Sequence, residues 1–228
     1  MDNLLKEVFF KLGVYEFAKK YLRKPYVKMH GLIFKFSAKK ALKKLIQTMN
    51  QNKYKYWLEF GTLLGAIREK GFISHDHDID IAMYIQERDE TLEQLLTSKG
   101  FKLKKRAKLL TGEIIEETYK YKTANIDIFY AYKMDNQIKI FDYQTFYNLS
   151  PNECIKQYGG LRVYENVLTE FDLIKSEFYD LDVLIPSNIH IHLGELYGKD
   201  YMIKNKNWKF DSSSVRKETT NLAVINYF

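Results

Sequence analysis

The chain has 228 residues, of which 46% are hydrophobic and 15% aromatic, enough apolar material for a folded domain with its own core. Its one cysteine, Cys154, excludes an internal disulfide framework. The formal net charge of +7 indicates surfaces that attract phosphate groups, whether of nucleotides, nucleic acid or anionic lipid. No apolar run approaches the roughly 18 residues that a membrane span needs, and no signal peptide is visible, so a cytoplasmic location is expected.

The N-terminal part combines helical spacing of apolar residues with many lysines and arginines. Residues 3–22 have the pattern of an amphipathic helix, and residues 38–52 form a second expected helix with Ser37 as its candidate N-cap. We therefore divide the chain into a basic amphipathic segment, 1–36, and a main domain, 37–228. The basic segment fits contact with an anionic membrane surface, or packing as a helix on the main domain.

The remaining elements indicate a mixed domain. Strands are expected at 54–60, 79–84, 117–123, 125–133 and 138–143, and helices at 61–68, 87–99 and 188–197. A second basic cluster, at 98–110, is interpreted either as solvated surface or as a phosphate-attracting patch. We expect an α+β fold, with a small mixed sheet and flanking helices.

Three aspartates at alternate positions, Asp76, Asp78 and Asp80, lead into one expected strand. On a strand, Asp78 and Asp80 share one face. Ile79 and Ile81 share the other, and their burial fixes the register. Two carboxylates about 6 Å apart repel by roughly 2–3 kcal/mol at an effective dielectric near 20, so a cation is expected between them. Oxygen ligands on a rigid strand suit Mg²⁺ or Mn²⁺.

A later aspartate, Asp127, lies between Ile126 and Ile128 in another strand-like run. If the two strands are neighbours, Asp127 points into the same cleft, and three acids can hold one or two divalent ions for phosphoryl transfer. Asp76 is a further candidate ligand or base, or else a turn residue. A calcium loop beginning at Asp76 is disfavoured, because its sixth position is Ile81 where that loop needs glycine.

Ahead of the aspartates, Gly61 and Thr62 join an expected strand to an expected helix. Such a turn is typical of a phosphate site, because glycine allows close backbone approach, a hydroxyl donates a hydrogen bond, and the first N–H groups of a helix are free. Arg68 can add charge to the same phosphates. Glu59 is expected to orient the turn.

The histidines suggest a zinc site from His75, His77, His190 and His192. On a strand the first two would face away from the aspartates, and the last two lie two residues apart on an expected helix, so their side chains diverge. We therefore expect packing or surface roles for all of them.

The run YWLEFGTLLGAIREKGFISHDHDIDIAM, residues 56–83, closely resembles the core motif of the LicD family, which includes fukutin-related proteins. That family is placed in the nucleotidyltransferase-fold superfamily, whose signature is a small-residue turn, an acid pair between apolar residues, and a later lone acid. The residues matching this signature, in order, are Gly61, Thr62, Asp78, Asp80 and Asp127. The stretch LGELYGKDYM, residues 193–202, is similar to the family's ending.

The resemblance implies that residues 37–228 are a catalytic domain. Its reaction would transfer a phospho-alcohol, such as phosphocholine or ribitol phosphate, from a CDP-activated donor to a hydroxyl of a cell-surface glycan, free or lipid-linked, as in bacterial capsule or lipopolysaccharide modification. Mg²⁺ or Mn²⁺ would be the cofactor, and no specific nucleic acid would be a partner. The implied roles are metal ligation by Asp78, Asp80 and Asp127, base catalysis by Asp127 or Asp76, and phosphate binding by Gly61, Thr62 and Arg68.

The chain departs from the family pattern at two places. Ser74 and His75 stand where Pro-Trp is usual, and His77 stands where an acid is usual. These changes leave the shape of the cleft rim and the donor open. A choline head group would favour an aromatic cage, and the aromatic residues near the motifs are Tyr56, Trp57, Tyr197, Tyr201 and Trp208, for which core packing is the alternative.

Two other functions fit the same residues. A nucleotidyltransferase that moves NMP from an NTP to a small molecule, protein or RNA would use the same acids. A non-catalytic binder of nucleic acid or membranes would use only the positive charge.

Overall fold

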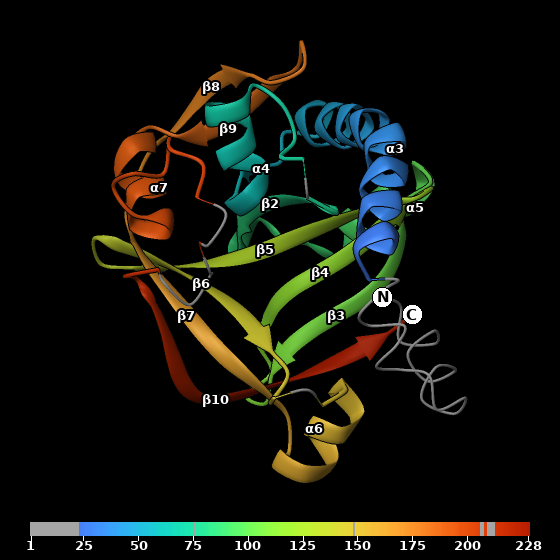
Figure 1. Ribbon diagram of the computed structural model, residues 1–228, viewed down its shortest axis with the longest axis vertical. Coiled ribbons are helices and arrows are strands. Elements are labelled where there is room, and N and C mark those ends of the chain that lie inside the picture. The colour runs from blue at the N-terminus through green and yellow to red at the C-terminus, as the bar shows by residue number, and fades with distance from the viewer. Residues whose placement is uncertain (1–22, 75, 148, 206–207, 209–212) are drawn as a thin grey trace.

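The computed structural model describes residues 23–74, 76–147, 149–205, 208 and 213–228 (Figure 1). The strands are β1 (Trp57–Leu58), β2 (Asp78–Tyr84), β3 (Lys102–Leu109), β4 (Ile114–Tyr121), β5 (Ala124–Met134), β6 (Gln137–Gln144), β7 (Leu161–Thr169), β8 (Leu173–Glu177), β9 (Asp182–Pro186) and β10 (Arg216–Tyr227). The helices are α3 (Arg23–Gln51), α4 (Phe60–Leu64), the π-helix η1 (Gly65–Glu69), the 3-10 helix η2 (Ile85–Glu87), α5 (Glu90–Ser98), α6 (Pro151–Tyr158) and α7 (Ile189–Tyr197).

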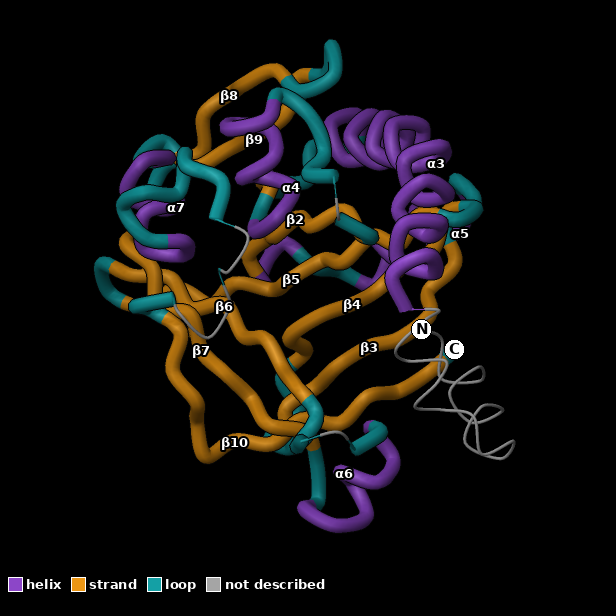
Figure 2. Tube along the Cα trace, in the orientation of Figure 1, coloured by secondary structure: helices purple, strands orange, loops and turns teal. Residues whose placement is uncertain are grey.

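The main sheet has eight strands in the order β1-β2-β5-β4-β3-β10-β7-β6, and β6 also pairs with β5. The strands from β5 round to β6 therefore close into a ring, seen in Figure 2 as strands surrounding the middle of the molecule. Among the described strands, β2 and β5 form the one parallel pair. Strand β5 serves two neighbours in turn, because residues 125–131 pair with β2 and residues 131–134 pair with β6.

The expected small mixed sheet with flanking helices, and with it the nucleotidyltransferase-like fold, is wrong. The sheet is large, mostly antiparallel and closed, and three strands of the ring, β3, β7 and β10, were not among the expected elements. Strand β3 lies inside the basic cluster at 98–110. Its sequence, KLKKRAKL, lacks the simple alternation of apolar and polar residues that indicates a strand, because two register shifts interrupt its pairing with β4.

Helix α3 covers residues 38–51 of the helix expected at 38–52, but it extends back to Arg23. Ser37 is therefore not an N-cap: it lies inside the helix, and its hydroxyl is 2.6 Å from Thr123 Oγ1. The expected helix at 3–22 lies outside the described residues, so the division at residue 36 stays a prediction. In the described part of the chain, no helix has the length and apolarity to cross a membrane.

The core holds β2 and β5 firmly against α3. Ile79 and Ile81 of β2 and Ile126 and Ile128 of β5 are completely buried in one cluster with leucines of α3. Burying each such side chain contributes about 1.5–3 kcal/mol, so slipping either strand by one residue would expose that area and bury its charges instead. The predicted anchoring role of the isoleucines is confirmed.

Candidate metal and phosphate site

Asp78, Asp80 and Asp127 converge where β2 and β5 run side by side. In this parallel pair Asp80 is opposite Asp127, and Asp78 is opposite Asn125. One carboxylate oxygen from each of the three aspartates lies within 4.8 Å of the others. The two strands are thus neighbours, as predicted, and Asp127 reaches the same place as the acid pair.

Burial and mutual repulsion raise the pKa values of this cluster. Burial, followed by the charges of Asp78 and Asp127, raises the pKa of Asp80 well above its usual range. Burial, with the nearby charge of Glu116, raises the pKa of Asp127 to about 8. Burial also raises the pKa of Asp78. The site therefore disfavours three bare negative charges, and a bound divalent cation would remove that penalty.

Asp76 lies beside the cluster, at the entry to β2. Burial, then the charge of Asp78, raises its pKa to about 7. Its Oδ2 is buried without a hydrogen-bond partner among the described residues. A Cβ placed on Gly61 would lie 3.5 Å from either carboxylate oxygen of Asp76. The side chain therefore faces the Gly61 turn and the aspartates.

The Gly61-Thr62 turn is packed directly on this cluster. A Cβ on Gly61 would stand 3.3 Å from Asp80 Oδ2, a distance that only glycine tolerates without displacing the carboxylate. Thr62 is completely buried, and its Oγ1 accepts a 2.8 Å hydrogen bond from the Asp80 N–H. Thr62 fastens the turn to β2, and Gly61 is the member of the pair that faces the carboxylates.

The turn is oriented from behind by Glu59, as its position in the sequence suggested. Glu59 accepts hydrogen bonds from the Phe60 N–H at 3.1 Å, from Trp57 Nε1 at 2.6 Å and from His192 Nε2 at 2.8 Å. Glu59, Trp57 and His192 are completely buried. Phe60 has a left-handed backbone, with φ of 42°, which costs about 1–2 kcal/mol and is held by these contacts.

The predicted phosphate ligand Arg68 lies next to the cluster but has protein partners. Its Nη1 donates to the Tyr201 carbonyl at 3.0 Å, and its Nε donates to Glu69 Oε1 at 3.1 Å. Its charge also opposes the rise in the pKa of Asp76, so it lies within electrostatic reach of that carboxylate. An anion bound at the cluster would therefore compete with existing contacts for this guanidinium.

The segment 193–202 runs past the same place. Burial, then the charge of Asp80, raises the pKa of Tyr197, so its hydroxyl lies within electrostatic reach of that carboxylate. The ring of Trp208 lies 4.8 Å from that of Tyr197. Tyr56 and Trp57 are completely buried in the core, as the packing alternative predicts. The Tyr197–Trp208 pair therefore offers an aromatic surface that includes a ring within electrostatic reach of Asp80.

The described histidines do not form a zinc site. His192 bonds Glu59 and His190 Nδ1 lies 2.6 Å from the Tyr201 hydroxyl, while His77 is exposed and His75 lies outside the described residues. Among the described residues, Asp78, Asp80 and Asp127 form the single group of potential metal ligands. The link from His192 to the Gly61 turn could not be predicted, because one histidine on an apolar helix carries no signal of a partner 133 residues away.

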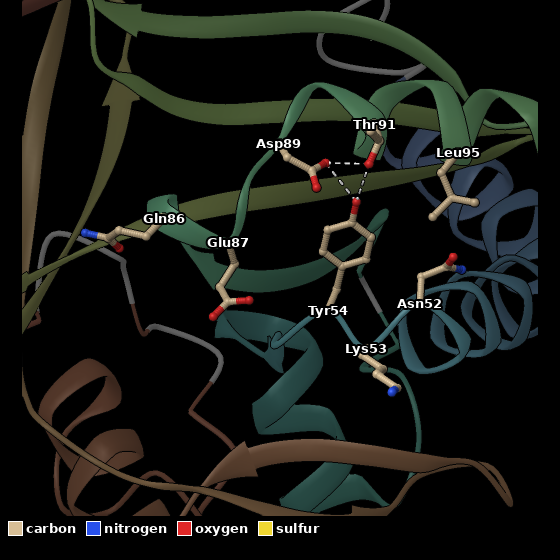
Figure 3. Close-up of a pocket in the computed structure, with 8 residues that line it drawn as sticks. All are labelled: Asn52, Lys53, Tyr54, Gln86, Glu87, Asp89, Thr91 and Leu95. Atoms are coloured by element: carbon tan, nitrogen blue, oxygen red, sulfur yellow. Dashed lines mark hydrogen bonds between the residues drawn. The ribbon is translucent and has the colours of Figure 1, made fainter.

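A surface pocket of about 530 Å³ lies at the opposite end of β2 (Figure 3). Three of its polar side chains are bonded together: Tyr54 donates to Asp89 Oδ1 at 2.8 Å, and the same oxygen accepts from Thr91 and from the Leu92 N–H in the first turn of α5. These contacts stabilise the N-terminus of α5, and none of the three clustered aspartates lines the pocket.

The fold and site define a protein whose main sheet carries a partly buried aspartate cluster, suited to a divalent cation, beside a glycine turn. Residues 53–188 match the family model described as LicD/FKTN/FKRP, nucleotidyltransferase domain. The chain belongs to the LicD family.

The chain is also similar to individual proteins, in each case over only part of their length. The chain is 24% identical over 183 residues to mouse (Mus musculus) ribitol-5-phosphate transferase FKTN, which is 80% of this chain and 37% of that protein. Human (Homo sapiens) FKTN is also 24% identical, over 185 residues, 81% of this chain and 37% of that protein. An uncharacterized protein of Rickettsia prowazekii (strain Madrid E) is 41% identical over 69 residues, 28% of this chain and 26% of that protein. The chain thus spans little more than a third of the FKTN proteins.

Proposed function

We propose that the chain is a divalent-metal-dependent transferase that moves a phospho-alcohol, such as ribitol phosphate or phosphocholine, from a CDP-activated donor to a hydroxyl of a glycan. Membership of the LicD family and similarity to proteins named ribitol-5-phosphate transferases support this type of reaction. The observation that carries the proposal is the convergence of Asp78, Asp80 and Asp127, with oxygens within 4.8 Å of one another.

The donor set fits Mg²⁺ or Mn²⁺, which prefer carboxylate oxygens on rigid elements. None of the three carboxylates has an ion-pair partner in the described part of the chain. Asp78, Asp80 and Asp127 would hold the ion. When bound, it would supply positive charge to the diphosphate and to the leaving CMP.

The remaining residues of the site act on substrate and proton. Gly61 lets the turn pack against the carboxylates that would hold the ion, because a Cβ there would lie 3.3 Å from Asp80 Oδ2, and the diphosphate bound to the ion would then lie near the backbone of the turn. Asp76 Oδ2, buried and free of protein partners in the described residues, accepts the proton of the attacking hydroxyl. Asp127 is the second candidate for this base. Arg68 contacts the donor phosphates after releasing the Tyr201 carbonyl.

The alcohol of the donor is recognised, in this proposal, near Tyr197 and Trp208. Their rings, 4.8 Å apart, offer an aromatic surface that includes a ring within electrostatic reach of Asp80. Such a surface attracts a quaternary ammonium group by about 0.5–2 kcal/mol, and it also packs against the carbon chain of a polyol. Phosphocholine and ribitol phosphate are therefore both compatible with it, and a direct comparison decides between them.

The test is a donor screen with Mg²⁺ and the full chain. CDP-ribitol, CDP-choline, CDP-glycerol and CDP-ethanolamine are incubated with and without glycan acceptors, and CMP release is measured. We expect one donor to be turned over, faster with acceptor, and expect Asp78→Asn to stop turnover while Asp135→Asn, at an exposed turn, does not. Turnover that survives Asp78→Asn and Asp80→Asn would refute the metal assignment.

A nucleotidyltransferase activity is the second candidate, favoured by the description of the matching family model. It would transfer NMP from an NTP and release pyrophosphate. Pyrophosphate release from NTPs, with no CMP release from any CDP-alcohol, would establish this alternative in place of phospho-alcohol transfer.

A further inference from the structure

A row of polar side chains leads from Asp127 along the inner wall of the closed sheet. Thr118 lies opposite Asp127 in the β4–β5 pair, and its hydroxyl donates to Asp127 Oδ1. The same hydroxyl is 3.2 Å from Glu116 Oε1. Lys105 Nζ donates to that Glu116 oxygen at 2.8 Å and to the Tyr143 hydroxyl at 2.7 Å. The row thus links the cluster to three further strands, β4, β3 and β6.

A β-bulge in β3 directs Lys105 into this row. Leu103 is opposite Tyr119 on β4, but the next paired residue is Lys105, opposite Thr118, so Lys104 is an extra residue with no opposite residue on β4. Because side chains alternate between the two faces of a strand, one extra residue moves each later side chain to the other face. Lys105 therefore shares the face of Thr118, while Arg106 points to the other face, where it pairs with Glu117.

The single hydrogen of the Thr118 hydroxyl orients the Asp127 carboxylate. A threonine hydroxyl has one hydrogen, and the shorter contact assigns it to Asp127 Oδ1. The Lys105 ammonium supplies positive charge to Glu116, which is 8% exposed and would otherwise repel the aspartates. With Oδ1 engaged by Thr118, Oδ2 of Asp127 remains available to a cation. Outer contacts of this kind orient metal-binding carboxylates and tune their affinity.

We propose that Thr118, Glu116 and Lys105 are positioning residues that hold Asp127 in the geometry for binding a divalent cation, and that the bulge at Lys104 brings Lys105 into this set. The inference rests on the proposed function only in taking Asp127 as a ligand. It does not depend on the identity of the donor or of the acceptor.

The first test compares two substitutions at Thr118, with Mn²⁺ binding to the full chain measured by calorimetry. Thr118→Val keeps the shape but removes the donor, and we expect it to weaken Mn²⁺ binding by about 10- to 100-fold. Thr118→Ser keeps the donor and should bind within about threefold of the unmodified protein. A merely structural role for Thr118 predicts equal affinity in both folded variants.

The second test uses the sign of the effect at Lys105. If the Lys105 charge only repelled the bound cation, Lys105→Met would tighten Mn²⁺ binding. If Lys105 is a positioning residue, the same substitution weakens Mn²⁺ binding, because Glu116 loses its partner and turns toward Thr118 or the ion. Lys104→Met, at the exposed bulge residue, is the matched control and should leave the affinity unchanged.

The outcomes separate this inference from the proposed function. Mn²⁺ binding that Thr118→Val leaves intact, or that Lys105→Met tightens, overturns the positioning role even if phospho-alcohol transfer is observed. If Thr118→Val weakens Mn²⁺ binding but the unmodified protein turns over no CDP-alcohol, the positioning role is supported and the transferase proposal is not. If the unmodified protein binds no Mn²⁺, both are wrong.

Discussion

The two faces of the sheet at β2, β5 and β4 carry two groups of carboxylates with opposite electrostatics. On the outer face, Glu117 is 1% exposed and lies 2.9 Å from Arg88 and 2.5 Å from Arg106. Burial alone would raise its pKa, but hydrogen bonds from Arg88 and Tyr130 outweigh burial, and its pKa is lowered. On the inner face, Asp80 is 9% exposed and Asp127 is half-buried, and their pKa values are raised.

The difference lies in the partners supplied by the chain itself. Around Glu117, the guanidinium groups of Arg88 and Arg106 balance the negative charge of the carboxylate. The aspartate cluster holds more negative charge than its neighbours balance, which is a cost to the folded protein unless something from outside binds. Buried charge alone therefore does not identify a functional site, whereas buried charge without a partner does indicate one.

The largest expected effect is on the group around Glu117. Glu117→Gln removes the shared acceptor of two buried guanidinium groups, and we expect it to reduce the free energy of unfolding by about 3 kcal/mol. Chemical denaturation measures this. Glu170→Gln, which breaks an exposed pair with Lys133, is the control and should leave the unfolding midpoint nearly unchanged. Equal losses of unfolding free energy in the two variants would mean that the Glu117 group is no more important to stability than an exposed ion pair.

Asp80→Asn should act in the opposite way. Removing one of the repelling charges is expected to raise the melting temperature of the metal-free protein and to weaken Mn²⁺ binding by more than about 100-fold, because even outer contacts to metal ligands contribute 10- to 100-fold. Thermal melts in EDTA and calorimetry with Mn²⁺ measure the two effects. A lower melting temperature in EDTA would mean that the cluster is satisfied without a cation.

Gly61→Ala should have a smaller effect on the same site. The added Cβ would stand 3.3 Å from Asp80 Oδ2 and displace that carboxylate by a few tenths of an ångström. We expect Mn²⁺ affinity and turnover to fall by about tenfold, since metal ligands tolerate little misplacement. Gly194→Ala, in α7 with no atom within 4 Å of the new Cβ, is the matched control.

A further expected effect is the pH dependence of stability. Because the pKa of Glu117 is lower in the folded protein than its usual value of 4.5, its contribution is present above that value and is lost as pH falls through the folded pKa. The pKa of Asp127 is raised to about 8, so its contribution has the opposite sign and metal-free stability falls as pH rises from about 4 to 8.

Melting temperatures in EDTA from pH 3 to pH 9 check both signs. Glu117→Gln should flatten the acidic limb of the profile, and Asp127→Asn should flatten the limb toward pH 8. If the melting temperature of Asp127→Asn falls as steeply toward pH 8 as that of the unmodified protein, Asp127 does not titrate in the folded protein with a raised pKa.

The sequence predicted the aspartate cluster well because local pattern determines it. The alternation of Asp78, Ile79, Asp80 and Ile81 fixes which side chains face the core, and the repeat of that pattern around Asp127 identifies the partner strand. Both signals lie within a few residues, and the burial of the isoleucines in the structure follows from them.

The closed sheet could not be predicted in the same way, because long-range pairing produces it. In β3 the bulge at Lys104 and the inward-facing Lys105 break the pattern of a half-buried strand, so a basic surface is the natural interpretation. Helix α6 was predictable in principle. Ser150, Pro151 and Glu153 form a capping box with proline at the first turn, a signal that sequence analysis overlooked.

Strand β10 has a consequence for how the molecule comes to be assembled. It follows every other strand along the chain, yet it sits between β3 and β7 and joins them. During synthesis, at about 5–20 residues per second, more than a hundred residues are added after β3 before β10, its second neighbour in the sheet, is made. We expect a nascent chain lacking residues 216–227 to expose an unpaired edge on β3, which is the edge most open to chaperones or to mispairing with another copy.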